Sequence, residues 1–162
     1  MEVVQKLLQD PDYLYYLSLT KNYESGRRYC CHNFSHLLDV ARIAWILCLE
    51  RQIKLSRPVV YAAALLHDIG RFAQHEDESI DHAAESASLA EPLLTRHGFS
   101  AAETKLILQA ILVHRQTPET VTDLLGAVLA EADDLSRLCY NCSAQAGCYK
   151  AKRMPTLNGI QY

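Results

Sequence analysis

The sequence "AALLHDIGRF", residues 63–72, is the most informative stretch of the chain. With "VVYA" before it, residues 59–62, it forms an apolar run that predicts a buried helix. His67 and Asp68 stand side by side at the end of that helix. A carboxylate is disfavoured at a helix C-terminus, where the macrodipole is negative, and an unpaired charge is costly to bury. Another part of the fold is therefore expected to compensate Asp68.

Outward from this stretch, the pattern of apolar residues is helical almost throughout. Besides the helix at residues 56–68, the spacing predicts helices at residues 10–25, 35–52, 81–98, 100–115 and 122–138. No alternating run predicts a strand. The fold class is therefore expected to be all-α, with a helical bundle at residues 1–138 and a cysteine-containing tail at residues 139–162 packed on the same domain.

Capping residues set the expected helix boundaries. Ser56 is placed to cap the helix that carries His67, and Ser100 with Glu103 forms a capping box. Gly70 is expected at the C-terminal cap of the helix at residues 56–68. Pro92 is expected to kink or break the helix at residues 81–98.

Composition restricts the class of protein. The 162 residues are 49% hydrophobic and 22% charged, with a net charge of −3, as in an ordinary soluble globular domain. No basic stripe favours nucleic acid as a partner. No apolar run approaches the ~20 residues of a membrane span, and no signal peptide is visible. We therefore expect a cytoplasmic protein whose six cysteines are reduced or bound to metal.

Polar residues interrupt several of the apolar helix faces. His36, His82 and His114 each lie on the apolar stripe of a different helix. Asp133 lies at the edge of the last stripe, whereas Asp134 is expected to point away. A single buried histidine is usually a hydrogen-bonded core residue. Imidazoles and carboxylates that converge from several helices instead favour a divalent metal site in the bundle core, and a cation would also compensate Asp68.

The sequence resembles a known family in three segments. These are "SHLLDVARIA" at 35–44, "HDIGR" at 67–71 and "EADDLSR" at 131–137. Over residues 30–138 they look like the metal-dependent HD-domain phosphohydrolases. The resemblance implies an all-α bundle with a central metal site. It also implies that His36, His67, Asp68 and Asp133 are metal ligands.

The number of metal ions is suggested by two further residues. His82 and His114 resemble the additional histidines of binuclear members, such as the cyclic-dinucleotide phosphodiesterases and the diadenosine tetraphosphate hydrolases. We therefore favour two divalent ions over one, with iron, manganese, magnesium, nickel and zinc all compatible. The segment "VHRQ" and the lack of a Gly-Tyr-Pro signature differ from the cyclic-dinucleotide branch. That substrate is therefore not favoured.

Candidate catalytic residues surround the expected ligands. "CHNFSH", residues 31–36, resembles the His-Asn-x-x-His segment of the cyclic-nucleotide phosphodiesterases, which implies that His32 is a general acid. The alternative is a capping or solvent-exposed His32. Asp68 is expected to act in catalysis as a ligand that bridges two ions. Arg71 and Arg115 are candidates for holding a phosphate, although an ordinary surface role is favoured for Arg115.

The cysteines predict a second site. Cys139, Cys142 and Cys148 form C-x2-C-x5-C, whose first pair has metal-ligand spacing. Cys30 or Cys31 could supply the fourth ligand, and Cys30 is preferred. Zinc and an iron–sulfur cluster are both compatible with such a set, and the alternative is unligated reduced thiols. The site is expected to lie beside the mouth of the central site.

These features favour a metal-dependent phosphohydrolase, either a phosphomonoesterase or a phosphodiesterase. Its substrate is expected to be a nucleotide or another small phosphate ester. Two alternatives remain: a non-catalytic HD module that binds a nucleotide, and an oxygen-activating HD enzyme with a di-iron site. The sequence leaves the oligomeric state open.

Overall fold

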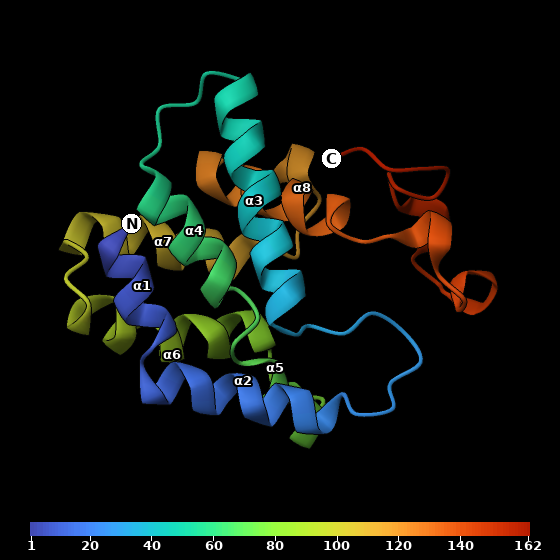
Figure 1. Cartoon of the computed structure of the whole chain (residues 1–162), viewed down its shortest axis with the longest axis horizontal. Helices are drawn as coiled ribbons and strands as arrows, with labels where there is room; N and C mark the ends of the chain where they lie inside the picture. Colours follow the sequence, from blue (N-terminus) through green and yellow to red (C-terminus); the bar gives the residue numbers. More distant parts are fainter.

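The computed structural model describes residues 1–162 and consists of helices joined by loops, without a strand (Figure 1). The all-α prediction is confirmed. The α-helices are α1 (Glu2–Leu8), α2 (Pro11–Tyr23), α3 (Phe34–Glu50), α4 (Arg57–Leu66), α5 (Arg71–Glu76), α6 (His82–Arg96), α7 (Ala101–Val113) and α8 (Leu124–Leu135). Short 3₁₀ helices follow at η1 (Pro118–Thr120), η2 (Cys139–Asn141), η3 (Gln145–Gly147) and η4 (Ala151–Arg153). None of the helices combines the length and apolar character needed to cross a membrane.

Helix α4 lies at the centre of the bundle. It packs against α3 and α7 most extensively, and also against α1, α6 and α8. All of its residues from 59 to 66 except Tyr61 are almost completely buried. A helix that is apolar on all sides can only be stable when other helices surround it. This burial fixes the C-terminal end of α4, where His67 and Asp68 follow, in the interior of the molecule.

The predicted boundaries hold for most helices. The capping box of Ser100 and Glu103 is present at the start of α7, whereas Ser56 occupies the cap of α4 without a side-chain hydrogen bond. Helix α6 continues through Pro92, whose ring is exposed. Because Pro92 has no N–H, the carbonyl of Ser88 lacks its helical hydrogen bond. Ser88 is exposed, so water can reach this carbonyl instead. The expected break is therefore absent.

The role predicted for Gly70 is wrong. The C-terminal cap of α4 is His67, and Gly70 instead occupies the N-cap of α5, a short helix that the sequence did not predict. A Cβ atom at Gly70 would lie 2.5 Å from the backbone nitrogen of Ser86 in α6. The Gly70 amide also donates a hydrogen bond to Ser86 Oγ at 2.9 Å. A glycine is required here because the backbone of α6 passes so closely.

The C-terminal tail and the loop between α2 and α3 extend from the same side of the bundle (Figure 1). The hydroxyl of Tyr29, in that loop, donates a hydrogen bond to the carbonyl of Gly147 at 3.1 Å. The tail returns to the bundle where Thr156 donates to the Arg137 carbonyl and the Tyr140 amide donates to the Thr156 carbonyl at 3.0 Å. Two segments more than 100 residues apart in sequence thus meet beside the bundle.

Candidate metal centre

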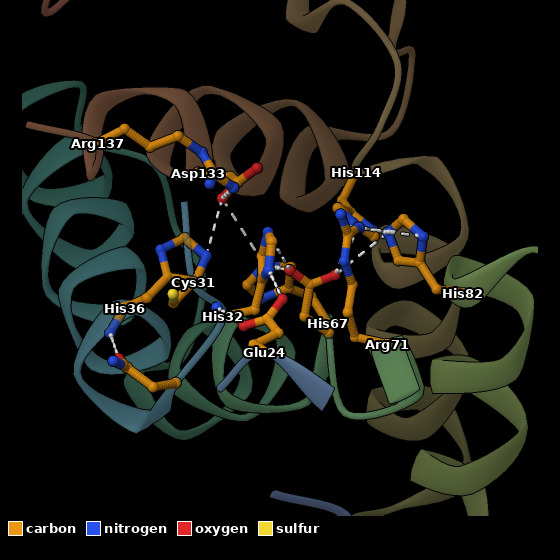
Figure 2. A network of polar contacts seen from close by, with 12 residues as sticks. Glu24, Cys31, His32, His36, His67, Arg71, His82, His114, Asp133 and Arg137 are labelled. Carbon is orange, nitrogen blue, oxygen red and sulfur yellow. Dashed lines mark hydrogen bonds and ion pairs between the residues drawn. The ribbon is translucent and has the colours of Figure 1, made fainter. Parts of the chain in front are cut away.

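Five histidines form a continuous row in the interior of the bundle (Figure 2). His32 precedes α3, His36 lies in its first turn, His67 follows α4, His114 follows α7, and His82 begins α6. Adjacent rings in the order 32, 36, 67, 114, 82 have centroids 4.9–5.6 Å apart. The structure therefore brings together the histidines that the sequence predicted as ligands or as an acid.

Helix ends orient two of these rings. His67 and His114 occupy the C-terminal caps of α4 and α7, where backbone carbonyls have no helical partner. His67 Nδ1 lies 2.7 Å from the carbonyl of Ala64, and His114 Nδ1 lies 2.6 Å from the carbonyl of Ile111. A carbonyl only accepts, so each Nδ1 carries a proton, and each Nε2 faces the Asp68 carboxylate.

The remaining three rings are held in the same way by side chains. His32 Nδ1 lies 2.5 Å from Glu24 Oε1, and His82 Nδ1 lies 2.8 Å from Gln74 Oε1. His36 Nδ1 lies 3.2 Å from Ser136 Oγ, whose own proton goes to the Asp133 carbonyl at 2.8 Å. An acceptor on Nδ1 is the usual partner that orients a metal-ligating histidine. The Nε2 atoms therefore face the centre, where Arg71 Nη1 donates to that of His82 at 2.9 Å.

Asp68 connects the two halves of the row. Its Oδ2 atom faces His67 Nε2 at 3.3 Å and His32 Nε2 at 3.8 Å. Its Oδ1 atom faces His82 Nε2 at 3.2 Å and His114 Nε2 at 3.6 Å. The two oxygens of one carboxylate thus point toward different pairs of imidazoles, which is the arrangement that a ligand shared between two ions needs.

Asp133 completes the other half of the site. Its Oδ1 atom lies 3.1 Å from His36 Nε2 and 3.9 Å from His67 Nε2. Arg137, one helical turn later, donates to the same oxygen at 2.6 Å. Asp133 thus lies at the edge of the apolar stripe of α8, as the sequence predicts, and its carboxylate reaches the imidazoles.

Both carboxylates are ionised. Burial alone would raise the pKa of Asp133, but the charge of Arg137 and the contact with His36 hold it well below its usual range. Burial would also raise the pKa of Asp68, but His67 and His32 outweigh that effect and keep it low. Burial lowers the pKa of His36 and of His82, which favours their neutral forms. Burial would also lower the pKa of His67, but Asp68 and Asp133 outweigh that effect and raise it. The two buried carboxylates thus attract positive charge to the site.

Several polar atoms at the centre have no hydrogen-bond partner. These are His36 Nε2, His67 Nε2 and Asp68 Oδ1, all of them buried. Unsatisfied buried polar groups are rare in folded proteins and require an explanation. Two groups of three ligand atoms lie within 4.8 Å of one another: His36, His67 and Asp133 form one, and His67, Asp68 and His114 form the other. The donor set of imidazole nitrogens and carboxylate oxygens fits a divalent transition metal.

His32 is neither a capping residue nor an exposed one. The N-cap of α3 is Asn33, and His32 is only 4% exposed. Glu24 accepts from both the ring and the backbone amide of His32, each at 2.5 Å. Burial lowers the pKa of His32 to about 4, although Asp68 and Glu24 oppose that shift. The resting ring is therefore neutral, with a proton on Nδ1 and a lone pair directed toward Asp68.

The two arginine candidates have different surroundings. Arg71 Nη1 lies 2.9 Å from His82 Nε2 and 4.0 Å from Asp68 Oδ1, at the edge of the metal centre. Arg115 forms an exposed ion pair with Asp81 at 2.9 Å and also lines the cavity beside the centre. Arg71 is therefore the better placed of the two to meet a substrate.

A cavity of about 390 Å³ opens above the centre. Its floor contains Asp68, His82, His114 and His32, and five cationic side chains line it: Arg71, Arg115, Arg137, Lys150 and Arg153. Asp134 also lines the cavity and lies 3.6 Å from Arg153, so the prediction that it points away is wrong. The cavity borders the last turn of α8, so the neighbouring residues Asp133 and Asp134 both line it.

Several residues of the centre were not predicted from the sequence. Arg137 follows Asp133 by four residues, a spacing at which opposite charges pair on a helix, so a signal for it existed. Glu24 lies eight residues before His32 across an irregular loop, and Gln74 lies on the unpredicted α5. Neither has a local sequence signal, because tertiary packing alone brings them to the imidazoles.

The cysteines lie beside this centre. Cys30, Cys139, Cys142 and Cys148 line one small cavity of about 20 Å³ together with Tyr29, Gln145 and Ala151. All four are free thiols. The exposed Cys31 is not part of that lining. Cys30 was the preferred fourth member of the set.

Comparison with known proteins identifies the family. The family model for the HD domain matches residues 33–138, a range that contains His36, His67, Asp68 and Asp133. The chain belongs to the HD domain family. This superfamily includes metal-dependent phosphohydrolases. An uncharacterized protein from Clostridium beijerinckii is 35% identical over 142 residues, which cover 88% of each chain.

Two other relatives are much longer proteins. Ribonuclease Y of Frankia alni is 34% identical over 100 residues, 62% of this chain and 12% of that protein. A bifunctional uridylyltransferase/uridylyl-removing enzyme of Rhodopseudomonas palustris is 39% identical over 80 residues, 49% of this chain and 7% of that protein. The HD domain thus occurs there as a small part of a larger molecule. No solved structure matches the chain.

Proposed function

We propose that this HD-domain protein is a metal-dependent phosphohydrolase that acts on a nucleotide or another small phosphate ester. One observation carries the proposal: five imidazoles surround two carboxylates, and three of these imidazoles and both carboxylates line a cavity whose walls carry cations. The anionic floor suits divalent ions, and the cationic walls suit phosphate. Phosphate hydrolysis at a metal centre needs both.

The ligands divide into two sets that share Asp68. His36, His67, Asp68 and Asp133 would hold one ion, and Asp68, His82 and His114 would hold a second. Bound divalent ions lower the pKa of a coordinated water and neutralise negative charge on the phosphate. Arg71 lies beside His82 Nε2 and Asp68 Oδ1, so its guanidinium must move outward when the second ion binds. That movement would direct it into the cavity, toward the substrate.

His32 and Glu24 form a proton-handling pair. The neutral His32 ring presents an unprotonated Nε2 atom toward the centre, 3.8 Å from Asp68 Oδ2. When it accepts a proton from the attacking water, the Glu24 carboxylate at 2.5 Å stabilises the resulting imidazolium. The protonated His32 can then donate the same proton to the leaving oxygen. His32 would thus act first as a general base and then as a general acid.

The cavity walls favour a phosphorylated substrate of nucleotide size. A volume of about 390 Å³ lies within the usual range of small-molecule sites. Arg71, Lys150 and Arg153 are placed to pair with phosphate oxygens. Tyr149, at the same wall, is 88% exposed and offers a ring against which a base could stack.

The relatives' names support the same chemistry. Ribonuclease and uridylyl-removing enzyme both describe reactions at nucleotide phosphate bonds. This chain shares with those proteins only their HD-containing segment. The cavity of about 390 Å³, bordered by Tyr149, Lys150 and Arg153 of the tail, has room for a small nucleotide.

A substrate panel tests the proposal. Protein purified anaerobically would be loaded in turn with manganese, iron, magnesium and nickel, and incubated with nucleoside mono-, di- and triphosphates, cyclic nucleotides and short dinucleotides. We expect metal-dependent hydrolysis of at least one of these, lost in Asp68→Ala and retained in Asp39→Ala, a surface carboxylate paired with Arg42. Binding of nucleotides without hydrolysis under every metal would contradict the proposal and favour a binding module. Oxygen consumption without product phosphate would contradict it in favour of an oxygen-activating enzyme.

A further inference from the structure

The three tail cysteines recur with a structural period of three. Successive backbone hydrogen bonds link Cys142 to Cys139 at 3.3 Å, Gln145 to Cys142 at 3.1 Å, Cys148 to Gln145 at 3.1 Å, and Ala151 to Cys148 at 3.2 Å. These are i to i+3 bonds, and side chains three residues apart in such turns lie on the same side. The residues at these five positions, 139, 142, 145, 148 and 151, all line one cavity.

A second segment closes that cavity. Cys30 and Tyr29 line it from the loop before α3, more than 100 residues away in sequence. The Tyr29 hydroxyl bonds to the Gly147 carbonyl at 3.1 Å and fixes the loop against the tail. Four of the six cysteines of the chain thus meet at one place, whereas Cys31 is exposed and Cys48 belongs to the hydrophobic core.

Apolar packing does not account for the order of the tail. Cys139, Ala144, Ala151 and Met154 are the buried apolar residues of the tail, and only Met154 has a large side chain. The large side chains of Leu138, Tyr140 and Tyr149 are 45–88% exposed, while small ones face inward. So little buried area gives little stabilisation. A bound metal centre can supply the missing free energy, because ligand binding offsets the entropy of ordering the loop.

A buried cation also lies beside the cysteines. Arg137 is buried, and its guanidinium lies between Asp133 of the metal centre and the thiol of Cys30. A cation beside a cysteine stabilises the thiolate, the form that binds metal. Four thiolates around a metal centre leave net negative charge, which Arg137 would partly neutralise.

The spacing of the sulfur atoms bears on the size of the centre. Sulfurs around one zinc ion lie about 3.8 Å apart, as follows from tetrahedral bonds of ~2.3 Å. The groups of three ligand atoms found within 4.8 Å of one another all belong to the histidine centre, and none contains a cysteine. Every group of three of these sulfurs therefore contains a pair more than 4.8 Å apart, wider than a single zinc ion requires. The cavity of about 20 Å³ would have to widen to hold a cluster.

We propose that Cys30, Cys139, Cys142 and Cys148 bind an iron–sulfur cluster. Four cysteine thiolates are the usual ligands of such clusters. The cluster would join the α2–α3 loop to the tail and thereby hold Tyr149, Lys150 and Arg153 at the wall of the central cavity. Its role is structural, and it stands apart from whichever reaction the histidine centre performs.

The test is chemical analysis of the full chain purified anaerobically. We expect iron and acid-labile sulfide in matching amounts, with the broad visible absorption of a thiolate-bound cluster. His67→Ala combined with Asp68→Ala removes central ligands, so iron retained with sulfide in this variant belongs to the cysteines. Cys142→Ser and Cys148→Ser should each lose the sulfide and the absorption. Cys31→Ser changes an exposed thiol next to Cys30 that does not line the cavity, so this variant should keep both.

Two results would overturn the proposal. One zinc ion per chain without sulfide would show a smaller centre, and four thiols that react freely with a thiol reagent in the wild-type protein would show no centre. Both measurements use the wild-type chain, so they remain decisive if the serine variants fail to fold. Loss of sulfide in Cys31→Ser but not in Cys142→Ser would also contradict the assigned ligands. A failure of phosphohydrolase activity would leave this result unaffected.

Discussion

The histidine centre and the cysteine tail hold their functional side chains in different ways. The histidines lie at or near the ends of helices whose packed core fixes their positions, and every Nδ1 atom has an acceptor that orients the ring. The cysteines lie on successive tight turns with little apolar surface behind them. The first region is preformed by packing, whereas the second, as we propose, depends on a bound cluster. Removal of metal should therefore leave the first in place and loosen the second.

The largest effect is expected from Asp68→Ala, which removes the carboxylate that both ligand sets share. Several kcal/mol of transition-state stabilisation would be lost, so we expect a fall in kcat/KM of roughly 10³-fold or more. Steady-state hydrolysis at saturating manganese measures this, with circular dichroism to show that the helices remain. Activity close to that of the wild type would remove Asp68 from the mechanism.

The neighbouring pair Asp133 and Asp134 gives a matched comparison on one helix. Asp133 Oδ1 contacts His36 and Arg137 at the centre, while Asp134 only reaches the cavity wall near Arg153. Asp133→Asn should reduce activity at least about 10-fold more than Asp134→Asn, because it weakens a metal ligand. The measurement is the manganese concentration needed for half-maximal activity of each variant. A larger effect of Asp134→Asn would reverse the assignment.

A smaller effect is expected from Glu24→Gln, which keeps the shape of the side chain but removes the charge beside His32. The carboxylate accepts from His32 Nδ1 and would stabilise the ring after it has taken a proton. Loss of such an orienting partner typically costs 10–100-fold in activity, and we expect about that range. The drop should appear in kcat and alter its pH profile. An unchanged kcat with an unchanged profile would leave the pair without a role in proton transfer.

The extent to which the sequence predicts this structure differs between the two regions for physical reasons. Periodicity located the long helices, and the histidines on their stripes were found because a polar residue on an apolar face stands out. Helices α1 and α5 were missed because they are only one or two turns long and carry little periodic signal. Glu24 and Gln74 were missed because their contacts with His32 and His82 exist only through tertiary packing.

Two glycines allow a comparison of stability in the two regions. Gly70→Ala would place a Cβ atom 2.5 Å from the α6 backbone, and such overpacking typically costs 1–3 kcal/mol. Gly147→Ala has its nearest neighbours at 3.5 Å and 3.7 Å, so we expect about the wild-type stability. Urea unfolding of both variants measures the difference. Equal stabilities would mean that α6 moves away from Gly70 at little cost.

The smallest effect on global stability is expected from removal of metal from the cysteines. The tail is poorly packed, so it should loosen while the bundle remains folded. Limited trypsin digestion should then cut rapidly after Lys150, Lys152 or Arg153, and slowly in the metal-replete protein. Equal digestion rates, with the same tail cleavage before and after metal removal, would show that the tail is ordered by packing alone.

The most direct test of the account is the binding of manganese to the histidine centre, followed by electron paramagnetic resonance. Because the two oxygens of Asp68 face different pairs of imidazoles, we expect two ions per chain with a spin-coupled spectrum. Asp68→Ala should abolish the coupling. A wild-type protein that binds no manganese above the level of Asp68→Ala would contradict the metal centre itself. A single uncoupled ion would contradict the shared carboxylate.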